Sequence, residues 1–90
     1  MQFVWDEAKA KRNLEKHGIT FAEATRVFSD PFALTFDDVA HSIYEQRWIT
    51  FGMINGKRHV VVCHAEGDLV IRIISAREMT KSERGLYEQG

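Results

Sequence analysis

The feature that most constrains the fold is an apolar run at residues 69–74, typical of a buried strand, which one charged residue, Arg72, interrupts. A second apolar run, Val60-Val61-Val62, lies within the strand expected at residues 59–64. Strands that are apolar on both faces are covered on both sides, so these two runs predict the centre of a sheet. A guanidinium stays charged at any ordinary pH, so Arg72 requires an anionic partner or a polar cleft.

A second arginine, Arg77, follows just past the predicted end of this strand. Two guanidiniums near one sheet end would form a fork for phosphate or carboxylate, because arginine binds these anions through paired hydrogen bonds. The alternative is a pair of structural salt bridges with some of the 13 acidic residues. The strand alone favours the salt bridges, since structural ion pairs are common.

Composition indicates one small, nearly neutral domain spanning residues 1–90. With 12 Lys+Arg against 13 Asp+Glu, any binding of a polyanion must come from a local patch. The single Cys63 cannot form an internal disulfide and is expected to pack as a small hydrophobe in a reducing compartment. No apolar stretch approaches the roughly 18 residues that span a bilayer, and Asp6 and Glu7 interrupt any secretion signal. We expect a cytoplasmic protein without a membrane association.

Helix signals come first in the chain. Asp6 has the character of an N-cap and Gly18 that of a left-handed C-cap, which predicts a helix between them. Thr20 and Glu23 have the spacing of a capping box and begin a second helix. The expected elements are a strand at residues 2–5 and helices at residues 6–17 and 21–28, the second closed by Asp30 and Pro31.

Strand signals follow. Asn55-Gly56 predicts a hairpin turn, because both residues tolerate positive φ angles. Thr80 and Glu83 form another capping box. The expected elements are strands at residues 33–36, 43–53 (one extended strand, or two with a bulge), 59–64 and 69–75, and a helix at residues 80–88. The predicted class is α+β: β-α-α, then a mainly antiparallel sheet and a short C-terminal helix.

Two blocks of the sequence form one pattern, in order, near the two ends of the chain. The first block consists of Trp5-Asp6-Glu7-Ala8-Lys9-Ala10, Asn13-Leu14, Lys16-His17-Gly18 and residues 21–24. The second consists of Glu45-Gln46-Arg47-Trp48, Gly52, residues 72–77, Glu83-Arg84 and residues 86–88. Together the two blocks cover almost the whole chain, and they resemble the BrnT family of type II toxin–antitoxin ribonuclease toxins. The departures are His64, where a hydroxyl-bearing residue is more usual, and Met79 and Gly85, which replace residues that are often basic.

The resemblance implies a RelE-like fold and a metal-independent endoribonuclease that arrests translation. It also implies neutralisation by a cognate BrnA-like antitoxin, with operator DNA contacted only through that antitoxin. No cofactor is expected. The alternative is a non-catalytic protein-binding module that acts with a DNA-binding partner in transcriptional autoregulation.

Metal-independent RNA cleavage uses the 2′-hydroxyl as nucleophile, so the protein must supply a base, cations around the phosphorane and a donor for the leaving oxygen. Arg72 and Arg77 fit the cationic role by residue type. Arg47 is a third candidate, and Trp48 beside it offers a surface for base stacking.

A basic stripe on the first predicted helix is the second candidate for binding RNA. Helical spacing puts Lys9, Asn13 and Lys16 on one stripe, with Arg12 and His17 at its edges. The alternative is an ordinary solvated face, which is what most such groupings are.

The sequence contains several candidates for the groups that transfer protons. His17 is a candidate base because imidazole titrates near neutral pH, yet a histidine in a last helical turn can equally cap free carbonyls. Further candidate proton donors are Tyr87, Glu88 and His64. His41 and His59 are interpreted as surface residues. His59, Cys63 and His64 cannot converge on a metal from one regular strand, so no metal site is expected.

Overall fold

The computed structural model describes residues 1–89, which form a five-stranded sheet with three α-helices and two short 3-10 helices. The strands are β1 (Gln2–Val4), β2 (Leu34–Asp37), β3 (Trp48–Ile54), β4 (Arg58–Gly67) and β5 (Val70–Glu78). The helices are α1 (Glu7–His17), α2 (Phe21–Ala24), η1 (Thr25–Ser29), η2 (Val39–His41) and α3 (Lys81–Gln89). The sheet order is β1-β5-β4-β3-β2, with β1 parallel to β5 and the other neighbours antiparallel. The predicted mixed α+β class is confirmed.

Local sequence signals located the ends of most elements correctly. The Asp6 carboxylate accepts a hydrogen bond from the backbone N–H of Lys9, and Gly18 ends α1 with a φ of 69°. Thr20 caps α2 as predicted: its hydroxyl accepts from the N–H of Glu23, and its own N–H donates to the Glu23 carboxylate. The Asn55-Gly56 turn has positive φ at both residues. These features are local, because each depends on residues within three positions of one another.

Two predicted boundaries near the first half of the sheet are wrong. The helix expected at residues 21–28 stops at Ala24 and tightens into η1, where Val27 lies so close to β3 that a Cβ at Gly52 would meet its Cβ at 2.8 Å. The strand expected from residue 43 begins only at Trp48. Ile43 and Tyr44 are 78% and 98% exposed in the preceding loop, so their apolar character does not mark a strand.

The boundary of the last strand is also wrong. Leu69 has a φ of 59° and belongs to the turn before β5, which then continues to Glu78 because it pairs with the start of β4. Arg77 therefore lies within the strand rather than past its end. The face on which the Arg77 side chain lies is therefore set by the alternation of side chains along β5.

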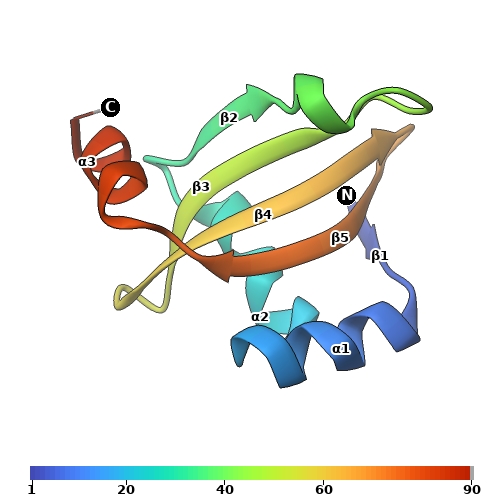
Figure 1. Ribbon diagram of the computed structural model, residues 1–90, viewed down its shortest axis with the longest axis horizontal. Helices are drawn as coiled ribbons and strands as arrows, with labels where there is room; N and C mark the ends of the chain where they lie inside the picture. The colour runs from blue at the N-terminus through green and yellow to red at the C-terminus, as the bar shows by residue number, and fades with distance from the viewer. Residues whose placement is uncertain (90) are drawn as a thin grey trace.

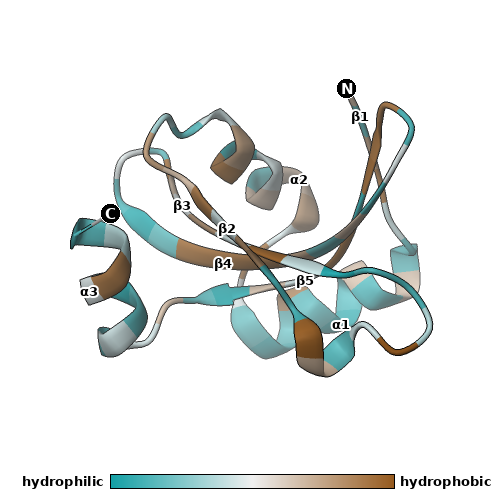
Figure 2. Cartoon of the chain, turned by 90° about the horizontal axis from the view of Figure 1, so that it is seen from above, coloured by the Kyte–Doolittle hydropathy of each residue, from teal (hydrophilic) through white to brown (hydrophobic). Residues whose placement is uncertain are grey.

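The core lies on one face of the sheet, beneath α2 and η1, which run behind the strands in Figure 1. Its buried residues are Ile19, Phe21, Ala24, Val27, Ile54, Val60, Val62, Ile71, Ile73 and Ala76. Figure 2 shows the apolar centre of β4 and the largely hydrophilic ribbon of α1. We call the opposite side, which faces the viewer in Figure 1, the open face.

A helix covers one end of the open face. There Tyr87 of α3 packs with Phe51, Val61 and Met79 in a small buried cluster. The expectation that both faces of the central strands are covered is therefore correct at the α3 end. No helix within residues 1–89 is long and apolar enough to cross a bilayer.

Helix α1 runs along the part of the β5 edge that β1 does not pair with, and Asn13 joins the two. Its side-chain amide donates to the carbonyls of Ile19 at 3.0 Å and Ala76 at 2.9 Å, and its oxygen accepts from the N–H of Ala76 at 3.0 Å. Asn13 is buried, so it is not part of the exposed basic stripe predicted for this helix. The Asn13 side chain thus satisfies the backbone groups of Ala76 that a neighbouring strand would otherwise bind.

We expect Asn13→Ala to lower the free energy of unfolding by about 2–4 kcal/mol, because it leaves buried backbone groups of Ala76 without partners. Urea denaturation measures this change. Glu15→Ala, at an exposed position of the same helix, serves as the control and should change stability by less than about 0.5 kcal/mol. Equal losses in the two variants would contradict the structural role of Asn13.

Candidate active site

A pocket of about 310 Å³ lies on the open face. Strands β3, β4 and β5 form its floor, and the loop around η2 forms its wall. The lining residues are Asp38, His41, Arg47, Ile49, Val61, Cys63, Ile74, Ser75 and Arg77. The pocket therefore combines two guanidiniums, an imidazole, a carboxylate, a thiol and a hydroxyl above an apolar floor.

A β-bulge determines which arginines face this side. Residues five positions apart point to opposite faces of a regular strand, as Arg72 and Arg77 would. The pairing between β4 and β5 shifts between Cys63 and His64, which leaves Ile74 as an extra residue. Arg77 pairs with Val61 and Arg72 pairs with Ala65, so both arginines lie on the open face.

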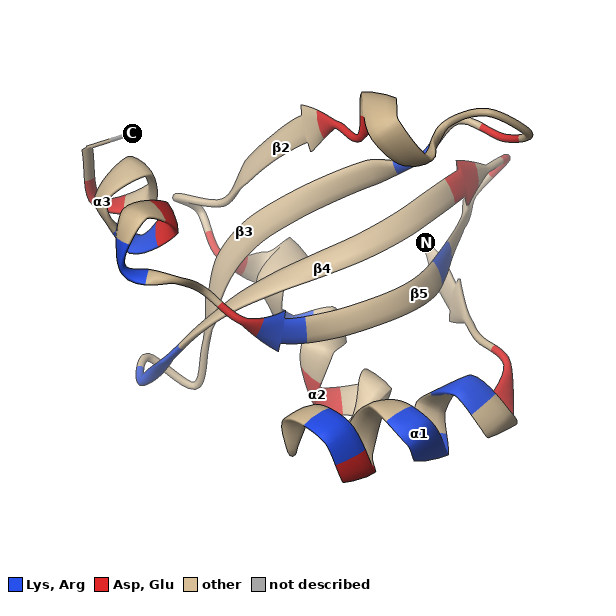
Figure 3. Ribbon diagram, in the orientation of Figure 1, with Lys and Arg blue, Asp and Glu red and all other residues tan. Residues whose placement is uncertain are grey.

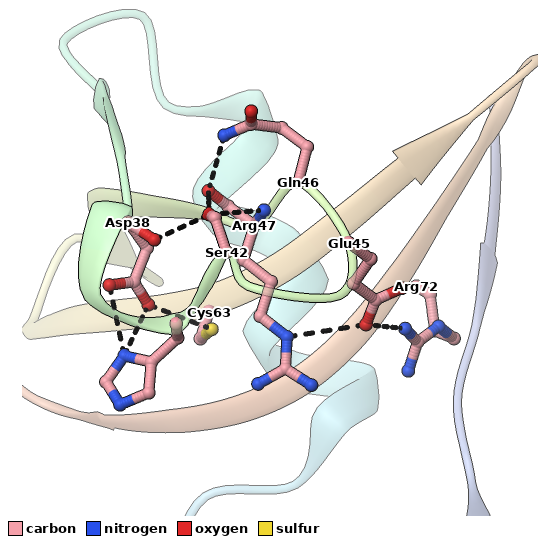
Figure 4. Close-up of polar contacts among 8 residues, drawn as sticks. Asp38, Ser42, Glu45, Gln46, Arg47, Cys63 and Arg72 are labelled. Atoms are coloured by element: carbon pink, nitrogen blue, oxygen red, sulfur yellow. Dashed lines mark hydrogen bonds and ion pairs between the residues drawn. The ribbon is translucent and has the colours of Figure 1, made fainter.

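Arg72 and Arg47 share one carboxylate. Figure 4 shows Glu45 between the two guanidiniums: Arg72 donates to its Oε1, and the Nε of Arg47 lies 3.3 Å from the same atom. The bond from Arg72, followed by the bond from Arg47, lowers the pKa of Glu45. One negative charge thus holds two positive charges together, and the group keeps a net positive charge.

Arg77 has its own carboxylate, Glu83 of α3. Two parallel hydrogen bonds of 2.7 and 2.9 Å join them, and they lower the pKa of Glu83 to about 2 and raise the pKa of Arg77. The Arg77 side chain is nevertheless 41% exposed. The salt bridges expected as the alternative role are present for both Arg72 and Arg77, but neither arginine is closed off from a ligand.

The loop that forms the wall is tied together at its base by Ser42. Its hydroxyl donates to the carbonyl of Asp38 at 2.6 Å and accepts from the N–H of Arg47 at 3.0 Å, and the N–H of Asp38 donates to the carbonyl of Arg47 at 2.9 Å. The Sγ of Cys63 lies 3.8 Å from Asp38 Oδ2. Burial, followed by the Asp38 charge, raises the pKa of this thiol, so Cys63 is a neutral part of the floor.

A second groove of about 310 Å³ lies between α1 and β5. It contains Lys9, Arg12, Asn13, Lys16, His17, Ile74 and Ser75. Ile74 and Ser75 also line the first pocket, so the two hollows meet at the bulge of β5. Figure 3 shows the basic segments along α1 and on β5 that border this surface. The predicted basic stripe is therefore brought beside the arginines, without the buried Asn13.

Four of the candidates named from the sequence lie away from this surface. Trp48 pairs with His64 on the core side of the sheet, whereas the neighbouring Arg47 lines the pocket. His64 is fully buried, and burial lowers its pKa to about 4. Tyr87 donates to Asp30 beneath α3, where burial and that carboxylate raise its pKa to about 12.

Glu88 is the fourth of these candidates. It lies on α3, in a separate hollow with Lys81 and Arg84. Within residues 1–89, no three His, Cys, Asp or Glu side chains gather closely enough to hold a metal ion.

Two residues of the pocket were missed by sequence reasoning. His41 was interpreted as a surface residue and Asp38 was not singled out, yet they line the pocket together. Their spacing was the available signal, because side chains three positions apart in a 3-10 turn lie on the same side.

Comparison with known proteins decides the family. The family model described as the ribonuclease toxin BrnT of type II toxin–antitoxin systems matches residues 5–83. The chain belongs to the BrnT family. The crystal structure of the Brucella abortus ribonuclease toxin BrnT is similar, with a TM-score of 0.71 and 27% identity over 90% of this chain and 99% of that chain. No curated protein matches. BrnT membership makes this chain a ribonuclease toxin of a type II system and implies an antitoxin protein as its partner.

Proposed function

We propose that this BrnT toxin is a metal-independent endoribonuclease that cuts RNA in the open-face pocket and thereby arrests translation. The proposal includes a RelE-like arrangement of the fold and attack by the 2′-hydroxyl, which gives a 2′,3′-cyclic phosphate. The observation that carries it is the clustering of Arg47, Arg72 and Arg77 on one solvent-exposed face.

The arginines suit a phosphorane because its charge is spread over equatorial oxygens that a guanidinium can bind in pairs. Arg47 and Arg77 line the pocket directly, and Arg72 reaches Arg47 through Glu45. A phosphate bound to Arg47 and Arg72 would compete with the Glu45 carboxylate for these two guanidiniums. The carboxylate therefore marks where an anion binds.

The α1 groove extends this surface for a longer strand. Lys9, Arg12 and Lys16 line it, and it meets the pocket at the bulge. RNA of several nucleotides would place one phosphate at the arginines and a neighbouring phosphate along α1. His17 also lines this groove and would contact the bound strand.

A BrnA-like antitoxin is the proposed partner, and operator DNA would be contacted only through it. The second candidate function, a binding module without catalysis, is supported by the exposed apolar residues Val39, Ile43 and Tyr44 in the loop beside the pocket. The two functions share the docking surface and differ in whether RNA is cut.

Purified protein is expected to cleave single-stranded RNA in excess EDTA and to leave 2′,3′-cyclic phosphate and 5′-hydroxyl ends, because the site supplies its own cations. Gel analysis with mass spectrometry of the ends measures this. An oligonucleotide with 2′-deoxyribose at the cut position is the matched control and should stay intact. Loss of cleavage in EDTA would assign the reaction to metal-dependent chemistry, and binding without cleavage would favour the second candidate.

A further inference from the structure

His41 and Asp38 form a carboxylate–imidazole pair at the rim of the pocket. The Nδ1 of His41 lies 3.0 and 3.1 Å from the two carboxylate oxygens of Asp38. The imidazole is 67% exposed, whereas the Asp38 side chain is only 15% exposed. A carboxylate on Nδ1 keeps the hydrogen on that nitrogen and leaves the lone pair of Nε2 as a proton acceptor. The pair thus presents a base to solvent.

The backbone of Asp38 is fixed within its loop, and its carboxylate contacts β4. Asp38 immediately precedes η2, its backbone is bonded to Ser42 and Arg47, and its Oδ2 lies 3.8 Å from the Cys63 thiol of β4. His41 ends the same 3-10 turn, which sets the two side chains three positions apart. The orientation of the imidazole therefore depends on the fold and not on chance contact at the surface.

The other groups around the imidazole favour a phosphate beside it. Arg47 from the loop and Arg77 from β5 line the same pocket, and Cys63 contributes a neutral thiol from β4. Of the four histidines, all within the described residues, only His41 lines this pocket. His17 lies in the α1 groove, His59 packs on Tyr87, and His64 is buried.

We propose that His41 is the general base of the ribonuclease reaction and that Asp38 is its positioning residue. This inference rests on the proposed function. Nε2 of His41 takes the proton of the 2′-hydroxyl, the 2′-oxygen forms a bond to phosphorus, and the bond from phosphorus to the 5′-oxygen breaks. The leaving oxygen takes a proton from water, and the resulting hydroxide recovers the proton from His41. The products are a 2′,3′-cyclic phosphate and a 5′-hydroxyl.

We expect His41→Gln to reduce kcat/KM for RNA cleavage by about 10²-fold to 10⁴-fold, the range of a lost general base. The exposed position of His41 means that the fold should persist, which circular dichroism checks. The control is His59→Gln, an imidazole outside the pocket, which should leave cleavage unchanged.

Asp38→Asn tests the positioning role, because it keeps a polar side chain but removes the charge that fixes the tautomer. It should lower kcat with little change in KM, which separates loss of positioning from loss of substrate binding. An RNA with sulfur in place of the leaving 5′-oxygen provides the decisive measurement, since it needs no proton on the leaving group. The defect of His41→Gln should persist with this substrate.

Rescue of His41→Gln by the sulfur substrate would overturn the assignment as base, because His41 would then be the acid. Native cleavage with an unimpaired His41→Gln variant would also overturn it, while leaving the proposed function intact. Absence of cleavage by the native protein would instead contradict the proposed function.

Discussion

Replacement of Arg77 by alanine is expected to reduce RNA cleavage by about 10²-fold to 10³-fold, the cost of removing one donor that stabilises a developing negative charge. Arg77 is the one guanidinium of the pocket that is both fixed by two parallel hydrogen bonds and supplied by a strand of the sheet. A group on a rigid element needs little rearrangement to bind the phosphorane. Single-turnover cleavage of a defined RNA measures the loss.

The ion pair with Glu83 requires a matched control, because Arg77→Ala also removes a contact between β5 and α3. Glu83→Gln breaks the same ion pair but leaves the guanidinium in the pocket. We expect it to keep cleavage within about threefold of the native rate, while its stability falls as much as that of Arg77→Ala, by about 1 kcal/mol for a partly exposed pair. Equal losses of cleavage in both variants would mean that Arg77 acts only by holding α3.

The shared face of Arg72 and Arg77 could not be predicted from the sequence. Both residues were singled out as charged positions at a buried strand, but Arg77 was placed past the end of that strand, and the face that the two share depends on the extra residue Ile74. A bulge is a property of the pairing between two strands, and nothing in the apolar run around Arg72 indicates it. The resemblance to the family placed both residues within one motif without explaining their geometry.

The fold followed from local signals wherever the cause was local. The caps at Asp6, Gly18 and Thr20 and the Asn55-Gly56 turn were predicted because neighbouring residues form them. The end of α2 was not, since it is set by the contact of η1 with Gly52, about 25 residues away in the chain. Tertiary packing decided that boundary.

The pocket shows the same division between local and distant causes. The basic stripe of α1 was predicted from helical spacing, except that Asn13 turns inward to bond with Ala76. His41 was missed because its significance comes from residues on three other elements that meet only in the folded chain: Arg47, Cys63 and Arg77. The three-residue spacing to Asp38 was the available signal, and a single 3-10 turn is too short to give a periodic pattern.

His64 was named as a candidate proton donor, and its position gives it a structural role with a consequence for stability. Its ring is fully buried, with Nε2 2.8 Å from the Thr50 hydroxyl and the Phe28 ring packed edge-on against it. Nδ1 has no hydrogen-bond partner, and the carboxylate of Glu66 lies 3.9 Å away. Glu66 would favour the protonated ring, but it is half exposed and screened by water, so burial dominates and lowers the pKa of His64 to about 4.

We expect the free energy of unfolding to fall by about 2 kcal/mol between about pH 7 and pH 5, and by about 3 kcal/mol by about pH 4. The unfolded chain takes up a proton on His64 below the ordinary histidine pKa of 6.5, whereas the folded chain does so only near a pKa of 4. Acidification through this window therefore stabilises the unfolded state.

Glu83 contributes separately, because its pKa is lowered from 4.5 to about 2 and its stabilising effect is lost below about pH 4.5. Urea denaturation at several pH values measures the slope, and His64→Leu, which fills the site without a titrating group, should remove most of it above about pH 5. The same slope in His64→Leu and the native protein would show that other groups cause the acid sensitivity.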